Sequence, residues 1–261
     1  MMHTRFFIFL FGTGLWCGLA FAQVCETLVV TGPPNSPPSS WVMDQKLVGA
    51  SVEFVETVAK AVGIIKVENK VFSTWTEALD AARLGHVDLI FSAAISAERE
   101  RYLNYIRPSY AGQNLYVVVR KGESFPLLKY DDLLGRRGGA GVGESYGGGK
   151  FDQFVSKKLD LVRSPNISDS LELLFNNKVD YVLGYENAIN SEIFTKNLLG
   201  KLDIVLTYPS YAETYLALSK RSKCSSLVKD LSAEIQKADQ NNLFYLLSKK
   251  YMKTFEQFTS Q

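Results

Sequence analysis

Histidine and cysteine are scarce in this 261-residue sequence, which contains two histidines and three cysteines. Zinc sites of the usual types need several His or Cys ligands, so these numbers argue against a metal site, and we expect no cofactor. A Ser-His-Asp triad would have to use His86, because His3 lies in a segment that we expect to be removed. His86 follows Gly85 in a predicted helix-to-strand turn, where a solvated side chain is the simpler interpretation.

The chain also lacks a large excess of charge of either sign. It contains 29 Lys and Arg and 27 Asp and Glu, which gives a formal net charge of +2. This balance provides no basic field and excludes nucleic acid as an expected partner. Hydrophobic residues make up 46% of the chain, so it can bury a core, and its length allows one large domain or two ordinary ones.

The N-terminal residues 1–22 are interpreted as a cleaved signal peptide. Arg5 supplies the positive charge, residues 6–19 form an uncharged apolar stretch of 14 residues, and Ala20-Phe21-Ala22 matches a cleavage site. The stretch is short for a membrane span, although an uncleaved N-terminal anchor is the alternative. The sequence therefore predicts an exported protein located in the periplasm.

Removal of this segment leaves two cysteines, Cys25 and Cys224. In an oxidising compartment two cysteines suggest one disulfide, Cys25–Cys224. The alternative is two separate buried thiols.

Hydrophobic patterning alternates between strands and helices along the rest of the chain. We expect strands at 27–31, 64–72, 87–91, 115–119, 161–163, 179–183, 202–206 and 214–218, separated by helices and followed by two C-terminal helices. This order predicts an α/β fold with parallel sheets. The segments Leu79…Val87-Asp88 and Leu171…Val179-Asp180 match at a spacing of 92 residues, which suggests two similar lobes.

Seven glycines lie between residues 138 and 149. A phosphate-binding P-loop is excluded because Glu144 occupies a required glycine position and Phe151 that of the Ser or Thr. The dinucleotide fingerprint fails as well, at Tyr146. What remains is a turn leading to a helix N-terminus, whose free N–H groups favour an anion, and Ser145 could cap this helix or bind a carboxylate. The alternative is a flexible connection that binds nothing.

Six segments together resemble a known family. They are Pro37-Pro38-Ser39-Ser40-Trp41, Trp75 with Val87-Asp88-Leu89, Ser96-Ala97-Glu98-Arg99, Pro108-Ser109-Tyr110, Gly143-Glu144-Ser145-Tyr146 and Val179-Asp180-Tyr181-Val182-Leu183. Their order and spacing are similar to those of the family 3 extracytoplasmic solute-binding proteins, the polar amino acid-binding components of ABC importers. The resemblance implies a two-lobed clamshell, each lobe a mainly parallel sheet flanked by helices, joined by two hinge strands. Lobe 1 would comprise residues 23–112 and 209–261, and lobe 2 residues 113–208.

The resemblance also implies a ligand site in the cleft. Arg99 would grip a carboxylate through paired hydrogen bonds, with Ser96 and Ser92 adding hydroxyl contacts. Trp75 would offer an aromatic face to the ligand. Each has an alternative, since Arg99 could belong to a solvated helix face and Trp75 to the core. Trp41 could line the pocket or pack within a lobe.

The sequence departs from the family pattern at the amine-binding end of the site. Tyr185 stands where the family usually has the aspartate that holds the ligand's amino group. Glu186 is adjacent and could replace it, and Glu144 is a second acidic candidate. An amino acid is therefore the default ligand, with other small carboxylates as alternatives.

From these features we predict a monomeric, non-enzymatic protein that captures a small polar solute, an amino acid or related carboxylate, for an inner-membrane ABC permease. The alternative is a periplasmic enzyme on the same scaffold, similar to cyclohexadienyl dehydratase, with Glu144 or Glu186 as general acid.

Overall fold

The computed structural model describes residues 25–147 and 149–259, without the side chains of residues 206–210. The predicted signal peptide lies outside the described residues. The strands are β1 (Thr27–Thr31), β2 (Asn35–Ser36), β3 (Ser40–Met43), β4 (Lys46–Val48), β5 (Lys66–Asn69), β6 (Leu89–Ala93), β7 (Leu103–Arg120), β8 (Arg137–Gly141), β9 (Asp160–Ser164), β10 (Tyr181–Tyr185) and β11 (Leu202–Ser219). The α-helices are α1 (Ala50–Ala61), α2 (Trp75–Leu84), α3 (Gly149–Lys158), α4 (Ile167–Phe175), α5 (Glu186–Thr195), α6 (Val228–Gln240) and α7 (Leu243–Thr259). Short 3-10 turns are η1 (Arg99–Arg101), η2 (Tyr130–Leu133) and η3 (Ser225–Leu227).

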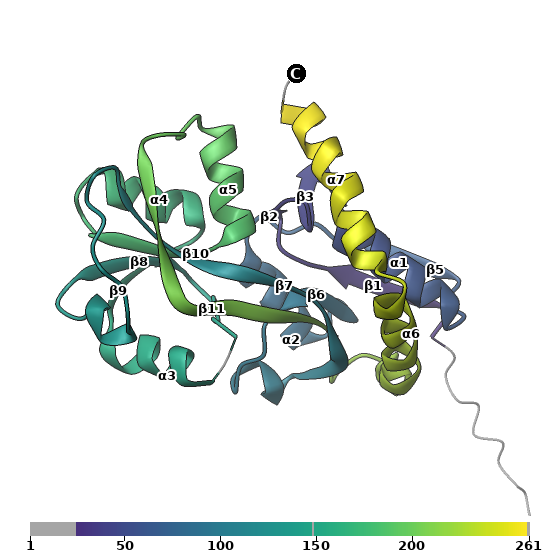
Figure 1. The fold of residues 1–261 in the computed structure, drawn as a ribbon. Coiled ribbons are helices and arrows are strands. Elements are labelled where there is room, and N and C mark those ends of the chain that lie inside the picture. The colour runs from purple at the N-terminus through teal and green to yellow at the C-terminus, as the bar shows by residue number, and fades with distance from the viewer. Residues whose placement is uncertain (1–24, 148, 260–261) are drawn as a thin grey trace, which may run out of the picture.

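One large sheet runs through both lobes in the strand order β5-β1-β6-β11-β7-β10-β8-β9, and β2, β3 and β4 form a small separate sheet. Strand β1 is parallel to β5 and β6, and β8 is parallel to β9 and β10. Only β7 and β11 pair antiparallel with their neighbours in this large sheet, as far as the chain is described. Helices flank each half of the sheet (Figure 1). The predicted two-lobed α/β fold is confirmed.

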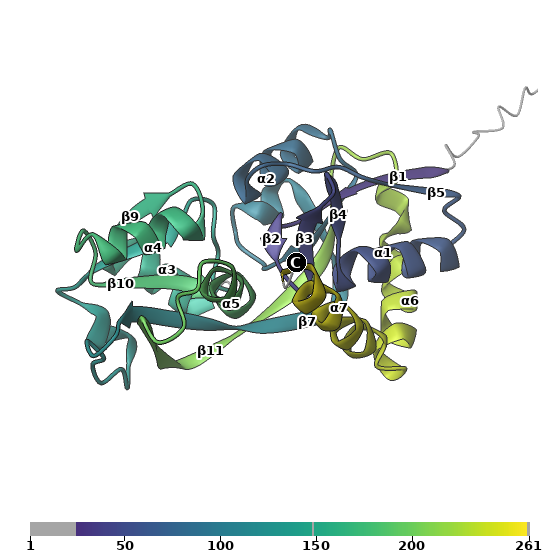
Figure 2. The ribbon, with the colours of Figure 1, turned by 90° about the horizontal axis from the view of Figure 1, so that it is seen from above.

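Two strands of 18 residues each, β7 and β11, connect the lobes (Figure 2). The prediction of separate short strands at 115–119, 202–206 and 214–218 was wrong, because these are parts of β7 and β11. Between the lobes, residues 111–114 of β7 are half-buried or exposed, so the apolar pattern fades there although the strand continues. The predicted lobe boundaries at 112 and 208 fall inside the two strands and stay a prediction.

The repeated Val-Asp segment has the same structural role in both lobes. The N–H of Asp88 donates to the carbonyl of Val29, and the Asp88 carboxylate accepts from the Val29 N–H at 2.9 Å. Asp180 forms the same pair of hydrogen bonds with Arg137, whose N–H lies 2.7 Å from the carboxylate. Each aspartate thereby fixes the neighbouring parallel strand, β1 or β8, which explains why the repeat was detectable in the sequence.

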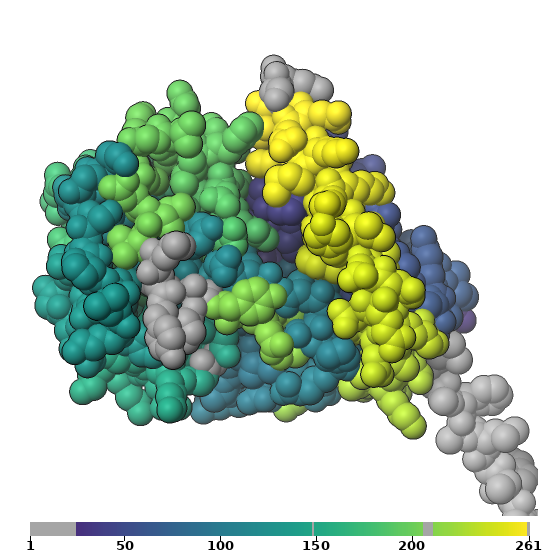
Figure 3. Space-filling model, viewed as in Figure 1, coloured from purple at the N-terminus to yellow at the C-terminus, as the bar shows by residue number. Residues whose placement is uncertain are grey.

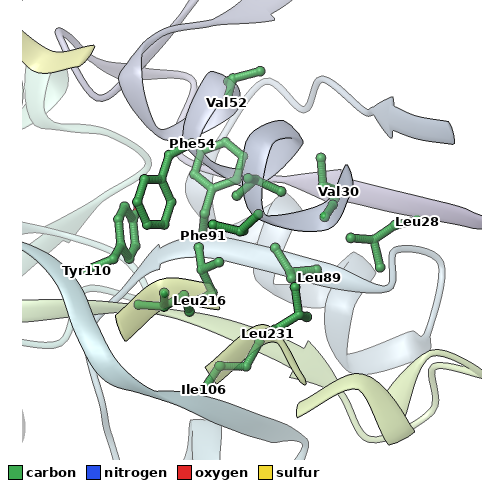
Figure 4. Packing of buried hydrophobic residues seen from close by; sticks show 14 of the residues in the cluster. Leu28, Val30, Val52, Phe54, Leu89, Phe91, Ile106, Tyr110, Leu216 and Leu231 are labelled. Atoms are coloured by element: carbon green, nitrogen blue, oxygen red, sulfur yellow. The ribbon is translucent and has the colours of Figure 1, made fainter. Parts of the chain in front are cut away.

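The larger core of lobe 1 lies between the sheet and helices α1, α6 and α7. Figure 4 shows Phe54 of α1 against Tyr110 of β7, and their stacked rings are 4.8 Å apart between centroids. Cys25 and Cys224 are both buried in this core and form a disulfide, with 5.2 Å between their Cα atoms. The predicted bridge is present, and the alternative of two separate thiols does not hold.

Candidate functional site

A cavity of about 300 Å³ lies between the lobes. Lobe 1 contributes the loop after β1, the start of α2 and the end of β6, while lobe 2 contributes the loop after β8 and parts of α4 and α5. In Figure 3 the purple early part of the described chain is visible in the hollow between α5 and α7. Six residues predicted from sequence line this cavity: Trp75, Ser92, Arg99, Glu144, Ser145 and Tyr185.

Arg99 belongs to the short turn η1 after β6, and only 4% of it is exposed, so it is not part of a solvated helix face. Its Nη1 donates to the carbonyl of Ala94 at 2.8 Å, and its Nη2 donates to the carbonyl of Gly143 at 2.7 Å. A guanidinium carries five N–H donors, so these two bonds orient the group and leave others for a ligand. Because Gly143 belongs to lobe 2, Arg99 also connects the lobes.

The two tryptophans lie in different places. Trp75 begins α2 at the cavity wall, half-buried, with the Arg99 guanidinium 5.5 Å from its ring centroid. Trp41 is 3% exposed and packs edge-on against Tyr251 and Phe255 of α7, so the structure corrects its assignment to the pocket. An indole ring next to a short Pro-rich loop can point either into the cleft or into its own lobe. Here it points into the lobe, where the apolar inner face of α7 covers it.

Ser92 closes the floor of the cavity at the end of β6, and its backbone adopts a left-handed conformation with φ of 56°. Such a conformation is unusual for serine and is found where surrounding contacts enforce it. The Ser92 hydroxyl lies 3.0 Å from both Ser39 Oγ and Tyr110 Oη, within a group of buried hydroxyls that also includes Ser51. Ser92 is therefore held rigidly below the cavity.

Glu144 lies in the loop after β8, within the glycine-rich segment. Within the described residues its carboxylate forms no hydrogen bond or ion pair, although it faces the cavity. Burial raises the pKa of Glu144, while the positive charges of Arg99 and Arg163 act in the opposite direction. A half-buried carboxylate without a protein partner in the described residues is a site that a cationic group stabilises.

The neighbouring polar groups of this loop are occupied by protein partners. The Ser145 hydroxyl donates to Asp152 in the first turn of α3, at 2.7 Å, and also contacts the carbonyl of Ile95. The Tyr185 hydroxyl donates to the carbonyl of Ser145, and burial raises the pKa of Tyr185 well above its usual value. Tyr185 is thus a neutral wall of the cavity at this end.

Two other predicted residues lie away from the cavity. The Ser96 hydroxyl accepts a hydrogen bond from the Arg99 N–H at 3.2 Å, so it holds the turn that carries Arg99. Glu186 is the first residue of α5, and its carboxylate accepts from the Asn114 side-chain amide of β7 at 2.8 Å. The helix turns this side chain away from the cleft, so Glu186 is not placed to replace an aspartate at position 185.

Sequence reasoning missed Glu192, Asn35 and Gln113, which all line the cavity. Tyr185, Ala188 and Glu192 follow a spacing of three and four residues, which puts them on one face of α5. That pattern was a readable signal for Glu192. Asn35 sits in a two-residue strand and Gln113 in the middle of β7, and neither position has a sequence pattern that points to a ligand.

Direct hydrogen bonds join the lobes on both sides of the cavity. On one side the Asn35 amide donates to Glu192 at 2.9 Å and accepts from the Ser191 hydroxyl at 2.8 Å. On the other, the Thr76 hydroxyl donates to the carbonyl of Val142 at 3.2 Å. The lobes are therefore in contact at more than one place beside the cavity.

The separate positions of the tryptophans give a fluorescence prediction. A solute entering the cavity changes the surroundings of Trp75, whereas Trp41 stays enclosed by α7. We expect Trp75→Phe to remove most of the solute-induced change in tryptophan emission, and Trp41→Phe to retain it. A fluorescence titration of both variants checks this, and a change that survives in Trp75→Phe but disappears in Trp41→Phe would contradict the placement.

Two lobes joined by a pair of long strands, with a polar cavity between them, define the class of two-lobed ligand-binding proteins whose lobes move about a hinge. The family model described as bacterial extracellular solute-binding proteins, family 3, matches residues 28–254, and the chain belongs to this family. It is a solute-binding protein. Among the described residues no helix is long and apolar enough to cross a membrane, and no three His, Cys, Asp or Glu side chains are grouped to hold a metal ion.

Relatives and solved structures agree with this membership. The chain is 24% identical to a probable histidine-binding protein of Campylobacter jejuni over 88% of this chain and 86% of the relative. It is 31% identical to the L-cystine-binding protein TcyJ of Escherichia coli, over 46% of this chain and 45% of that protein. An ancestral arginine-binding protein bound to arginine shares the fold with a TM-score of 0.70 at 21% identity, covering 87% of this chain and 98% of that one. A substrate-binding protein of an amino acid ABC transporter has a TM-score of 0.68 at 20% identity, covering 87% and 99%.

Proposed function

We propose that the protein is a periplasmic substrate-binding protein that captures an amino acid and delivers it to an inner-membrane ABC permease. The observation that carries this proposal is the buried Arg99 guanidinium, which is fixed by two carbonyls yet lines the cavity between the lobes with further N–H donors. A fixed guanidinium is suited to two parallel hydrogen bonds with a carboxylate. The histidine-binding and cystine-binding names of the relatives support an amino acid as the solute.

Glu144 supplies the complementary charge for the amino group. It lines the same cavity as Arg99 and has no protein partner within the described residues, whereas Glu186 points to β7. An α-amino acid presents a carboxylate and an ammonium group together, so one cationic and one anionic anchor match its head group. A cavity of about 300 Å³ is at the small end of ligand sites, which suits a solute of this size.

The remaining assignments follow from this function. Residues 1–22 act as a cleaved export signal, lobe 1 comprises residues 23–112 and 209–261, and lobe 2 comprises residues 113–208. The protein acts as a monomer that presents both lobes to the permease. Size-exclusion chromatography with light scattering, with and without solute, tests the oligomeric state.

A thermal-shift panel of all common amino acids and several other small carboxylates tests the function. A solute that binds only the folded protein stabilises it and so raises its melting temperature. At a solute concentration 100 times the dissociation constant, the free energy of unfolding increases by about 2.7 kcal/mol. We expect one or a few amino acids to raise the melting temperature clearly. Isothermal titration calorimetry with these amino acids then measures the dissociation constants. A panel in which no amino acid shifts the melting temperature, while another carboxylate does, would contradict the amino acid assignment.

In the enzymatic alternative only Glu144 remains a candidate for the general acid, because Glu186 lies outside the cavity. The raised pKa of Glu144 is what a general acid requires. We assign Glu144 to binding because the family is one of solute-binding proteins. Incubation with prephenate or arogenate is expected to give no aromatic product above the buffer control. Measurable turnover would establish the dehydratase function instead.

A further inference from the structure

Glu192 is a second carboxylate of the cavity, and the amino acid head group leaves it unused. It is only 4% exposed although it is charged, and it lines the cavity from α5. Its Oε1 accepts a hydrogen bond from the Asn35 amide at 2.9 Å, while its Oε2 has no hydrogen-bond partner within the described residues. A buried carboxylate whose hydrogen bonds are incomplete is costly, so the Glu192 side chain favours a further cationic partner.

The nearest cation does not satisfy Glu192 fully. Lys196 lies one turn further along α5, and its Nζ is 3.5 Å from Oε2 of Glu192, without the geometry of a hydrogen bond. The same Nζ contacts the hydroxyl of Ser168 and lies 3.8 Å from Glu172. Lys196 is solvent-exposed and shared among three oxygens, so its charge is screened more strongly than that of a group inside the cavity.

The two cavity carboxylates come from different elements, Glu144 from the loop after β8 and Glu192 from α5. Tyr185 contacts the loop beside Glu144 through its bond to the Ser145 carbonyl, and Glu192 lies two turns of α5 further on. At 1.5 Å per residue this separation is about 10 Å along the helix. An amino acid with a long cationic side chain, such as lysine or arginine, spans a distance of this order. The charged side chains that line the cavity in the described part of the chain are Arg99, Glu144 and Glu192, so acidic groups outnumber basic ones there.

We propose that Glu192 is the anchor for a cationic group at the far end of the solute, so the protein selects amino acids with a positively charged side chain. This inference rests on the proposed function and deepens it. In the bound complex the solute carboxylate contacts Arg99, its α-ammonium lies beside Glu144, and its terminal cation lies beside the Glu192 carboxylate. Asn35 holds the Glu192 side chain in place from the opposite lobe, so the contact is completed when the lobes meet.

Pairs of solutes that differ chiefly in the charged group at the end of the side chain test the inference on the unmodified protein. Arginine is compared with citrulline, and lysine with norleucine, by isothermal titration calorimetry. Hydrogen bonds to charged groups contribute about 1.5–3 kcal/mol, which corresponds to a preference of roughly 10- to 150-fold for the cationic member of each pair. Equal or tighter binding of citrulline and norleucine overturns the inference and leaves the proposed function intact.

Glu192→Gln removes the charge and keeps the size and the acceptor for Asn35. We expect it to abolish the preference for the cationic member of each pair and to leave the affinity for the neutral member within about threefold of the unmodified protein. Glu172→Gln is the matched control, because Glu172 shares Lys196 but is exposed on α4 and does not line the cavity. We expect Glu172→Gln to retain the full preference.

The outcomes separate a binding role from a structural one. If Glu192 serves only as the partner of Lys196 and Asn35, Glu192→Gln lowers the melting temperature and leaves the charge preference unchanged, which overturns the inference. Glu144→Gln is expected to weaken all four solutes alike, since each has the same head group. If no amino acid of any charge binds, the proposed function itself is wrong, and the inference falls with it.

Discussion

Replacing Arg99 by alanine is expected to weaken binding of the amino acid by about 30-fold to more than 1,000-fold. Truncating one partner of a buried, hydrogen-bonded charge pair costs about 2–5 kcal/mol, because the remaining carboxylate stays buried without its partner. Arg99 is 4% exposed and held by the carbonyls of Ala94 and Gly143, so its loss removes a fixed cationic partner from that carboxylate. Isothermal titration calorimetry with the best solute of the panel measures the effect.

Two controls make this result specific. Arg101→Ala removes an exposed arginine of the same short turn and should leave the affinity unchanged. The methyl ester of the same amino acid lacks the carboxylate charge, so its affinity should differ little between the unmodified protein and Arg99→Ala. Because Arg99 also contacts Gly143 of lobe 2, circular dichroism must show that the variant is folded. An affinity unchanged within threefold would remove Arg99 from the site.

Loss of the Cys25–Cys224 disulfide is expected to lower the free energy of unfolding by about 2–5 kcal/mol. The bridge joins residues 199 positions apart and ties the segment before β1 to the segment before α6. For a chain of this size each 1 kcal/mol changes the melting temperature by about 2–4 °C, so a decrease of roughly 4–20 °C is expected. The double variant Cys25→Ala with Cys224→Ala, studied by calorimetry, provides the measurement.

The effect should be confined to lobe 1. Both cysteines belong to the core beneath α1 and α6, and neither lines the cavity. We therefore expect an unchanged dissociation constant at temperatures where the variant is folded, and faster hydrogen exchange in β1 and α6 than in β8 and α4. A variant with the same melting temperature as the unmodified protein would mean that the bridge contributes nothing to stability.

The sequence could predict the fold because the same local rules operate in both lobes. The Val-Asp segments at 87–88 and 179–180 are readable since each aspartate bonds to the backbone of the next parallel strand. The long strands β7 and β11 were not readable as continuous elements. Their middle parts cross between the cores of the two lobes. Few buried residues contact them there, so their side chains need not be apolar.

The site was predicted in part for a similar reason. Arg99, Trp75 and Glu144 lie in or beside motifs with recognisable spacing, so they could be assigned to the cleft. The contact between Asn35 and Glu192 joins opposite lobes and residues 157 positions apart, and no local pattern encodes that contact, although helical spacing places Glu192 on the face of α5 that carries Tyr185. Trp41 was misplaced because its neighbours Tyr251 and Phe255 come from the opposite end of the chain.

The bond between Thr76 and Val142 has a consequence for how uptake is regulated. Thr76 does not line the solute cavity, so this bond adds the same free energy to lobe closure whichever solute is bound. Strengthening or weakening it changes every dissociation constant by one common factor and leaves the ratios between solutes unchanged. The concentration at which a cell begins to import can therefore evolve at the rim of the cleft, while the choice of nutrient is set separately by the residues inside it.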